Sequence, residues 1–512
     1  MEYYDKVNET YDYDSITKRI KQIFLECKDD RTKFAETVIE YFKPTNKEKK
    51  NNAEIPTPRE LKLEMTSKVP LPFWTEKQKV LEPSVGKGGF CLEVIECFMI
   101  GLKEKIPDEN ERYKIIVEEC LYFADINPVN IHITKLILDP NNEYKLNYYE
   151  GDFLKFELKD FGLDGFDLII GNPPYEKINQ TGDNKLYLLF IQKSLLILKI
   201  KKYLLFITPI NVKNYLFGGK NKNRSYISKF YNIKFISINV ANKYFNVGTF
   251  FCYFLIENIE VEECKTTVEF LREKSIIHDT IKIKKNDNLP LYMSNIDISI
   301  LNKVSNILRD NKYKTFDIKK GKYNKNNKIK EQRIRNFHFT NGEISKTKNN
   351  IFKYEIINKI TKKEIEIFYN KDNMNDRDKP KIIMCSGGYL MPYFDNIGKY
   401  NLSDNMLYFI NNSKLKYNNF KFLVDSNLLK YINKATMTDG LHGRDKVICN
   451  LKKINLSKLS NKKIYKYYNL SKDEINIIHS SLNISDDSSS DEKSSDSLSD
   501  SSSDEFNNYL SN

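Results

Sequence analysis

The chain has 512 residues, 40% of them apolar, so it is long enough for about two or three globular domains with true hydrophobic cores. It opens without a basic and apolar leader, and no apolar run approaches the roughly 20 residues that span a membrane, which predicts a soluble, intracellular, cytoplasmic protein without a membrane partner. The eight cysteines form no CxxC pair and the five histidines do not cluster, so a structural zinc site is disfavoured and no metal is expected.

The formal net charge is +13, which favours a polyanionic partner because basic surfaces release counterions when they bind phosphate backbones. The stretch SDDSSSDEKSSDSLSDSSSDE, residues 485–505, holds eight acidic residues and one lysine, so the rest of the chain is more basic than the total. AT-rich codons also enrich Lys, Asn, Ile and Tyr. Genomic bias explains the charge equally well, and the charge alone does not establish nucleic-acid binding.

The predicted elements begin with amphipathic helices in residues 1–45, where apolar residues recur three and four positions apart. From Lys77 to about Glu257, β-type apolar runs alternate with helical patterns, one of which opens with Asn127 as N-cap and Pro128 at the first helical position. This alternation predicts an α/β fold with a mostly parallel sheet covered by helices. The expected strands are 79–83, 120–126, 144–150 (the weakest), 166–171, 202–209, 233–240 and 250–256.

Beyond residue 263 the alternation fades into mixed short segments, which predicts a second, α+β domain. The final stretch lacks apolar residues to bury and is predicted to be a disordered acidic tail. The expected organisation is a helical segment 1–45, a catalytic domain 46–262, a second domain 263–475 and the tail 476–512.

Polar residues follow four of the predicted strands, and in doubly wound sheets ligands bind beyond the carboxyl ends of the strands. After the first strand comes Glu82, then a loop with Gly86 and Gly88. Glycines let the backbone turn tightly and approach a ligand, and the carboxylate suits a ligand with a cationic amino group better than a pyrophosphate. A plain strand-to-helix turn is the alternative.

The second and third strand ends each carry an aspartate. Asp125, in FADINP, can accept hydrogen bonds from ribose hydroxyls; its alternative role is that of an acid at a helix N-terminus. Asp152, in GDF, is a candidate acceptor for an adenine amino group, with Phe153 beside it. Taken alone, this tripeptide could equally be an ordinary turn.

The fourth strand ends in GNPPY, with Asn172, Pro173, Pro174 and Tyr175. Asn172 offers a carbonyl acceptor, and the prolines remove backbone donors, so that the Pro173 carbonyl can act as a second acceptor. Two acceptors gripping the two N–H bonds of a heteroaromatic amine would localise its nitrogen lone pair. Tyr175 offers a face on which the ring can stack.

Together, EPSVGKGGF, ADINP, GDF and GNPPY resemble the S-adenosylmethionine-dependent adenine-specific DNA methyltransferases, most strongly from about Thr57 to Glu257. In that family the motif begins with Asn or Asp, whereas cytosine amino-methyltransferases usually begin it with Ser. The resemblance implies a Rossmann-like domain with a mostly parallel seven-stranded sheet and a C-terminal target-recognition domain. It also implies S-adenosyl-L-methionine as cofactor without a metal.

The resemblance assigns roles by position. Thr57 and Pro58 belong to a segment that closes the methionine end of the cofactor site, ahead of the glycine loop. Phe245 resembles the aromatic that sandwiches a flipped target base, with Phe250 as its rival and plain strand packing as a further alternative. The other roles are a methionine pocket (Glu82, Gly86, Gly88), a ribose acceptor (Asp125), an adenine subsite (Asp152, Phe153) and a target-base site (Asn172, Pro173, Pro174, Tyr175).

The implied partner is double-stranded DNA, and the implied reaction is methyl transfer to the adenine 6-amino group after base flipping. A separate restriction nuclease is left open as a partner, and a monomer is expected. Candidate DNA contacts in basic segments are Lys220, Lys222, Arg224, Arg333 and Arg335. The alternatives are a protein glutamine-amide methyltransferase, an RNA adenine or guanine methyltransferase, and a DNA-binding subunit with an inactive cofactor fold.

Overall fold

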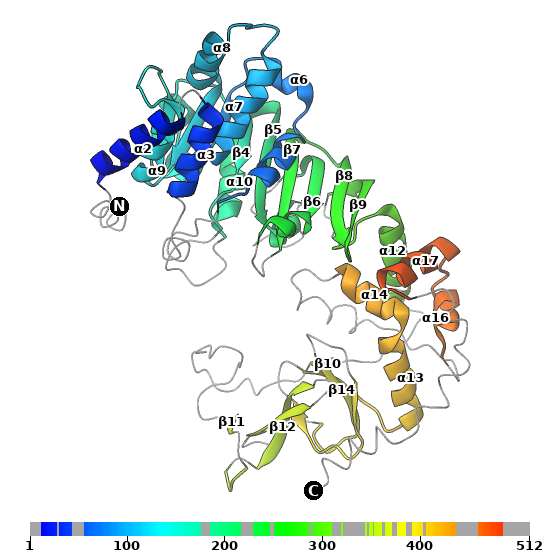
Figure 1. The fold of residues 1–512 in the computed structure, drawn as a ribbon. Coiled ribbons are helices and arrows are strands. Elements are labelled where there is room, and N and C mark those ends of the chain that lie inside the picture. The colour runs from blue at the N-terminus through cyan, green and yellow to red at the C-terminus, as the bar shows by residue number, and fades with distance from the viewer. Residues whose placement is uncertain are drawn as a thin grey trace. The chain divides into compact units, whose positions relative to one another are not determined.

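The protein forms two compact units in its computed structural model, residues 1–289 and residues 290–512 (Figure 1). The structure describes residues 12–27, 30–42, 56–175, 185–216, 229–245, 250–285, 287, 290–309, 319–320, 344–345, 348–351, 353–360, 364–370, 376–385, 392–402, 406–436 and 459–484.

The first unit contains the predicted strands and the motifs that follow them. Its helices are α2 (Tyr13–Cys27), α3 (Arg31–Tyr41), α5 (Arg59–Thr66), α6 (Leu71–Trp74), α7 (Gly89–Gly101), α8 (Glu109–Ile115), α9 (Pro128–Leu138), α10 (Leu186–Ile197) and α11 (Lys213–Leu216). Its strands are β1 (Val80–Glu82), β2 (Leu121–Asp125), β3 (Asn147–Glu150), β4 (Phe166–Gly171), β5 (Leu198–Pro209), β6 (Tyr231–Ile238), β7 (Phe251–Glu260), β8 (Glu263–Arg272) and β9 (Ser275–Lys284). Short helical turns include η1 (Ile116–Cys120), η2 (Phe153–Lys155), η3 (Leu158–Asp160), η4 (Ile210–Val212) and η5 (Val240–Tyr244).

One sheet of nine strands organises this unit, in the order β3-β2-β1-β4-β5-β7-β6-β8-β9. Strands β3, β2, β1, β4 and β5 run parallel, and β7 lies antiparallel between β5 and β6. Because β1, β2 and β4 are parallel neighbours, their carboxyl ends meet at one edge of the sheet. The predicted α/β class and mostly parallel sheet are confirmed.

The sheet has two strands more than expected, because the β8–β9 hairpin extends it beyond residue 262. Strand β8 pairs in parallel with β6, and its residues alternate between exposed and buried at its start. Half-buried strands of this kind carry no continuous apolar run, so a reading based on such runs missed them.

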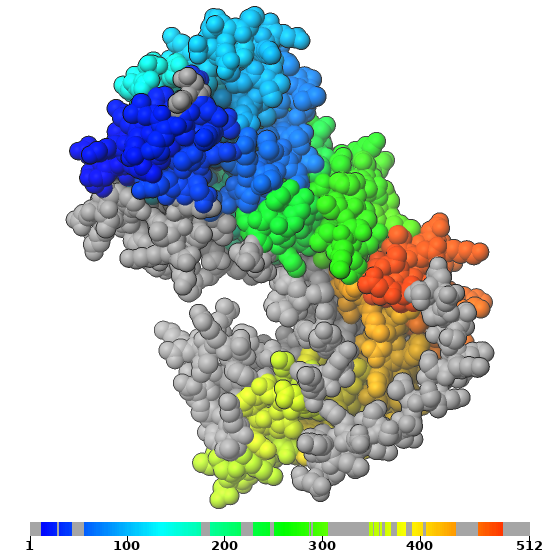
Figure 2. All heavy atoms as spheres, in the orientation of Figure 1, coloured from blue at the N-terminus to red at the C-terminus, as the bar shows by residue number. Residues whose placement is uncertain are grey.

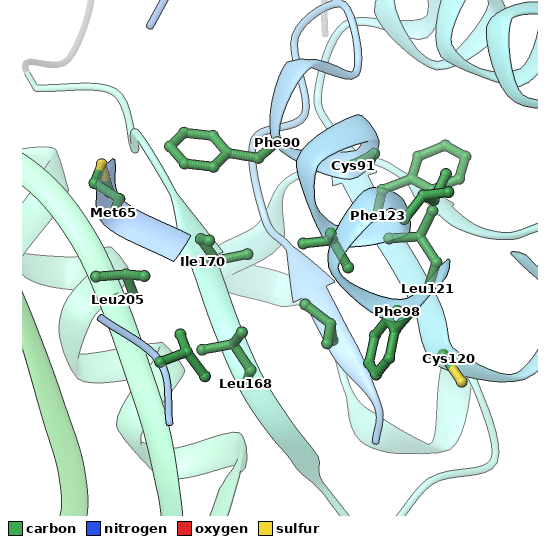
Figure 3. Close-up of a cluster of buried hydrophobic side chains, with 14 of the residues drawn as sticks. Met65, Phe90, Cys91, Phe98, Cys120, Leu121, Phe123, Leu168, Ile170 and Leu205 are labelled. Carbon is green, nitrogen blue, oxygen red and sulfur yellow. The ribbon is translucent and has the colours of Figure 1, made fainter. Parts of the chain in front are cut away.

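The core under α7 joins this helix to the sheet. Side chains of α7 share one buried cluster with Val80 of β1 and with alternate residues of β2, β4 and β5, and Met65 of α5 lies at the edge of this cluster (Figure 3). Strand β4 is buried at all six positions. Burying an aliphatic or aromatic side chain contributes on the order of 1.5–3 kcal/mol, so this cluster holds the loops at the strand ends on a rigid base.

The N-terminal helices α2 and α3 pack on α9. Ile20 and Ile23 of α2 and Phe34 of α3 share a buried cluster with Val129 and Ile133 of α9. Figure 2 shows these helices, in dark blue, joined in one surface with the lighter blue residues that follow residue 56. The predicted N-cap of α9 is confirmed, since the Asn127 side chain accepts a hydrogen bond from the Val129 amide at 3.1 Å, with a proline in the first turn.

The second unit combines small sheets with helices, as an α+β domain does. Its strands form two four-stranded sheets, in the orders β10-β17-β14-β15 and β11-β13-β12-β16, which share a core around Ile357 and Ile383. The strands are β10 (Lys319–Lys320), β11 (Ile344–Ser345), β12 (Tyr354–Ile360), β13 (Ile365–Asn370), β14 (Lys381–Cys385), β15 (Tyr393–Asp395), β16 (Asn401–Leu402) and β17 (Met406–Ile410). The helices are α12 (Asn295–Arg309), α13 (Lys414–Asp425), α14 (Asn427–Thr436), α16 (Asn461–Tyr467) and α17 (Lys472–Ser481).

Helix α17 continues past residue 476, where the acidic tail was expected to begin, and residues 485–512 lie outside the described residues. Across the ranges that the structure describes, no helix combines the length and the hydropathy needed to cross a membrane.

Candidate active site

A cavity of about 1220 Å³ lies at the carboxyl ends of β1, β2 and β4. Most of the predicted cofactor and catalytic residues line it: Thr57, Pro58, Glu82, Gly86, Asp125, Asp152, Phe153, Asn172, Pro173, Pro174 and Tyr175. Gly88 and Phe245 are not part of its lining. Some of these residues lie more than a hundred positions apart in the sequence, and the parallel strands bring them to one cavity.

The glycine loop after β1 is held in a left-handed conformation. Gly86 has φ of 54° and Gly88 has φ of 80°, a region that residues with a Cβ rarely adopt. A Cβ at Gly88 would also lie 3.2 Å from Cγ2 of Thr134. Gly88 therefore lets the loop pack closely against Thr134, while Gly86 lines the cavity.

Asp125 fixes the glycine loop to the neighbouring strand. Its Oδ2 accepts a hydrogen bond from the Gly86 amide at 2.9 Å, and its Oδ1 accepts one from the Asn127 amide at 2.8 Å. The carboxylate is only 8% exposed. Asp125 thus accepts hydrogen bonds both from the residue at the start of α9 and from the glycine loop, and both positions border the cavity.

Glu82 is buried at the floor of the site. Its Oε2 accepts a hydrogen bond from the Cys91 amide at 3.0 Å and lies 3.1 Å from the Cys91 sulfur. Burial raises the pKa of Glu82 to about 8, although the Cys91 hydrogen bonds and the Lys62 ammonium oppose this shift. The site therefore holds a carboxyl group that is ready to ionise when a cation comes close.

Replacing Glu82 with Gln should change how stability depends on pH. Between about pH 4.5 and pH 8 the folded protein keeps the Glu82 proton that the unfolded chain loses, so stability is highest below this window and is lost as pH rises through it. Urea unfolding across that range should show the wild type losing on the order of 1 kcal/mol per pH unit more than Glu82→Gln. Parallel pH profiles for the two proteins would contradict this assignment.

Asp152 and Phe153 form the third side of the cavity. Asp152 caps the short helix η2, and its Oδ1 accepts a hydrogen bond from the Leu154 amide at 3.0 Å. Phe153 is 2% exposed, and its ring centroid lies 5.0 Å from that of Phe190 in α10. The expected turn is present, and it also borders the cavity.

The NPPY residues after β4 are joined to the segment at Thr57. The Asn172 side-chain amide donates to Thr57 Oγ1 at 3.1 Å, and the Tyr175 hydroxyl donates to Asn172 Oδ1 at 2.8 Å. Ser84, in the glycine loop, donates to the Asn172 backbone carbonyl at 3.3 Å. The side-chain oxygen expected to grip a ligand amine thus accepts a hydrogen bond from the Tyr175 hydroxyl.

Aromatic rings continue from Tyr175 toward Phe245. The ring centroids of Tyr175 and Phe251 are 6.1 Å apart, and those of Phe245 and Phe251 are 4.5 Å apart. Burial raises the pKa of the Tyr175 hydroxyl well above its usual range, so it stays protonated and donates to Asn172. Phe250 is the alternative to Phe245 for stacking on the target base, and its backbone carbonyl accepts a hydrogen bond from the Ile210 amide.

Charged residues of α5 are the part of the site that sequence reasoning missed. Lys62 is buried and donates to the Gly89 carbonyl at 2.9 Å. Arg59 bonds to Glu36 of α3 and to Glu96 of α7. The helical spacing could have indicated that Lys62 is buried, because Lys62 and Thr66 recur on the same face as Leu61 and Met65, but it does not indicate the partners of Lys62.

The basic residues proposed to contact DNA, Lys220, Lys222, Arg224, Arg333 and Arg335, lie outside the described residues. No group of three or more His, Cys, Asp or Glu residues is placed to hold a metal ion in the ranges that are described.

The strand order and the cavity at the carboxyl ends of the parallel strands define a Rossmann-like methyltransferase fold. Residues 119–245 match the family model of the Eco57I restriction-modification methylases, so this segment is similar to that family. The matched residues include Asp125, Asp152, Asn172 to Tyr175 and Phe245, which confirms the resemblance first seen in the motifs. No curated protein matches the chain.

Solved structures similar to the chain at low identity include the following three. The Type IIL restriction-modification enzyme MmeI, in complex with DNA, is 10% identical over 83% of this chain and 71% of its own, with a TM-score of 0.47. The type IIG restriction endonuclease BpuSI is 11% identical over 89% of this chain and 63% of its own, with a TM-score of 0.41. A Vibrio vulnificus protein assigned as a type I modification subunit is 17% identical over 55% of this chain, with a TM-score of 0.36, and the present chain spans 59% of its length.

Proposed function

We propose that the protein transfers a methyl group from S-adenosyl-L-methionine to the exocyclic 6-amino group of an adenine in DNA. The observation that carries this proposal is the placement of Asn172, hydrogen-bonded to Thr57 and Tyr175, on the same cavity as Glu82, Asp125 and Asp152. An amine held at Asn172 would lie beside a ligand held by the three carboxylates.

The residues of the cavity fit this cofactor. S-adenosylmethionine, when bound, supplies an electrophilic methyl group on a sulfonium, together with a cationic amino group, a ribose and an adenine. Glu82 is the buried acid suited to the cationic amine, and it would lose its proton as the cation arrives. Asp125 would hold the ribose, and Asp152 with Phe153 would hold the adenine. The cavity of about 1220 Å³ exceeds the roughly 300–1,000 Å³ of common ligand pockets, which leaves room for an extruded base.

The target amine would be oriented by hydrogen bonds. Asn172 Oδ1, to which the Tyr175 hydroxyl donates, and the carbonyl of Pro173 are the two proposed acceptors. Asn172 is an orienting group and not a general base, because a neutral amide does not take up a proton at neutral pH. Catalysis would then rest on positioning and on hydrogen bonds that strengthen as positive charge develops on the nitrogen.

An adenine in duplex DNA reaches this cavity only when it leaves the base stack. Flipping costs a few kcal/mol, which contacts to the DNA backbone would offset. Tyr175 and Phe245, both packed on Phe251, are the aromatic faces proposed for the flipped base.

We propose that double-stranded DNA is bound by a protein monomer, and that the second unit reads the sequence. A separate restriction nuclease as partner belongs to the same proposal.

The experiment that tests this function offers the full chain three acceptors in parallel. Radiolabelled methyl transfer from S-adenosylmethionine is measured to duplex DNA, to structured RNA and to a protein with an exposed glutamine. Transfer to duplex DNA, with none to the other two, is the expected outcome. Label in the protein alone points to a glutamine-amide methyltransferase, and label in the RNA alone points to an RNA methyltransferase, and either result contradicts the proposal.

A further inference from the structure

Helix α5 and the residue Thr57 before it contact several parts of the proposed site. Thr57 accepts a hydrogen bond from Asn172 at 3.1 Å, and Lys62 donates to the glycine-loop carbonyl of Gly89 at 2.9 Å. Arg59 bonds to carboxylates of α3 and α7. Helix α5 also makes a further set of contacts toward Phe245, which none of the predicted roles explains.

Glu64 makes this further set of contacts. Its Oε1 accepts a hydrogen bond from the Tyr253 hydroxyl at 2.7 Å, and its Oε2 accepts one from the Tyr244 hydroxyl at 2.9 Å. The Lys243 ammonium lies 3.4 Å from Oε2. These donors come from residues more than 170 positions away in the chain, on η5 and β7. One side chain of α5 therefore ties the helix to η5 and β7, which lie next to Phe245 and carry Phe251. We call the adjoining rings of Tyr175, Phe251 and Phe245 the aromatic wall.

The carboxylate of Glu64 is suited to this role. Burial opposes its ionisation, but the hydroxyls of Tyr253 and Tyr244 and the Lys243 ammonium hold the pKa of Glu64 below its usual range. Its side chain is 19% exposed, so these interactions are only partly screened by water. Glu64 is not among the residues that line the cavity.

The contacts end next to Phe245. Tyr244 is the residue before it in the chain, and the Phe245 amide donates to the Asn242 carbonyl at 3.1 Å. Asn242 in turn accepts a hydrogen bond from the amide of Phe251, on which the Phe245 ring packs. A shift of η5 relative to α5 would therefore move the Phe245 ring.

We infer that Glu64 is a positioning residue that couples the helix closing the cofactor cavity to the aromatic wall at Phe245. The inference rests on the proposed function, because it gives that wall the task of stacking a flipped base. Glu64 holds η5 on α5 through two tyrosine hydroxyls and a lysine, and so sets the distance between the cofactor side and the base side of the site.

The test separates base handling from cofactor binding. In Glu64→Gln, the side chain keeps its shape but loses its charge and one acceptor. The base probe is a duplex with 2-aminopurine in place of the adenine that the wild type methylates, at a site found by sequencing DNA treated with the wild-type protein. We expect the fluorescence rise on binding to fall about threefold or more and the KM for DNA to rise about tenfold, while the Kd for S-adenosylmethionine changes less than about twofold.

Two further variants make the result decisive. Tyr244→Phe removes one donor without unpairing a buried charge, so it should shift the same two readouts in the same direction by a smaller factor, and it carries the test where Glu64→Gln does not fold. Glu257→Gln is the matched control, because it removes an equal charge from the other end of β7, where Glu257 accepts a hydrogen bond from Asn232. It should behave as the wild type.

Unchanged fluorescence and KM in both Glu64→Gln and Tyr244→Phe would overturn the inference. An equal loss of cofactor affinity and DNA handling would also overturn it, since that pattern indicates general loosening of α5. A wild-type protein that transfers no methyl group to DNA fails at an earlier step, and that outcome overturns the proposed function together with the inference built on it.

Discussion

Asn172→Ala should reduce methyl transfer by about a hundredfold to a thousandfold while leaving the affinity for S-adenosylmethionine within a few-fold of the wild type. The substitution removes the oxygen proposed to grip the target amine, and it also removes the hydrogen bonds to Thr57 and Tyr175. Single-turnover kinetics with saturating DNA measure the chemical step, and equilibrium titration measures the cofactor.

Two controls accompany this variant. Tyr175→Phe keeps the stacking ring and removes only the hydroxyl that donates to Asn172, so a much smaller loss is expected. Asn232→Ala removes an amide of β6 that bonds to Glu257 and should leave the rate unchanged. A Tyr175→Phe variant as impaired as Asn172→Ala would mean that the hydroxyl, and not the amide oxygen, carries the effect. Full activity of Asn172→Ala would remove the basis of the proposed mechanism.

Asp125→Ala should weaken S-adenosylmethionine binding by about a hundredfold or more. The substitution leaves the amides of Gly86 and Asn127 without their acceptor, so the glycine loop loses its anchor and the ribose its proposed acceptor. Removing acceptors from buried amides costs about 1–3 kcal/mol each, and a fall in melting temperature is therefore expected as well. Calorimetric titration below the melting temperature of the variant measures the cofactor affinity.

Asp167→Ala is the control that separates cofactor binding from stability. Asp167 is also a buried aspartate of the same sheet; it accepts a hydrogen bond from the Lys79 amide at 2.8 Å and lies 3.2 Å from the Lys202 ammonium. Its loss should lower the melting temperature comparably and leave the cofactor affinity unchanged, because it lies at the opposite end of β4 from the cavity. Equal loss of affinity in both variants would contradict a specific role for Asp125.

Six of the first seven strands could be predicted because they contain continuous apolar runs, as β4 is buried at every position. Strand β3 alternates between half-buried and exposed residues, which is why it was the weakest of the predicted strands. The strand-end residues followed from the same pattern, since Glu82, Asp125 and Asn172 each come at or after the end of a run. The hairpin β8–β9 could not be predicted in this way, because its residues alternate at the edge of the sheet.

The role of α5 was beyond sequence reasoning for a different reason. Thr57 was placed near the cofactor by resemblance, but the contacts of Lys62 and Glu64 depend on partners far along the chain. A carboxylate on a helix is ordinarily a solvated side chain, and only the fold brings the hydroxyls of Tyr244 and Tyr253 to it. The Tyr175 hydroxyl bond to Asn172 likewise depends on the turn that the two prolines make.

The central claim is that Asn172 and its neighbours hold the amine of an adenine, and the position of the transferred methyl group tests it most directly. Duplex DNA methylated by the full chain is digested to nucleosides, and the methylated nucleoside is identified by mass spectrometry. The account predicts N6-methyladenine, absent when the reaction is run with Asn172→Ala. A methylated cytosine, or DNA without any methylated base under conditions in which the cofactor binds, would contradict it.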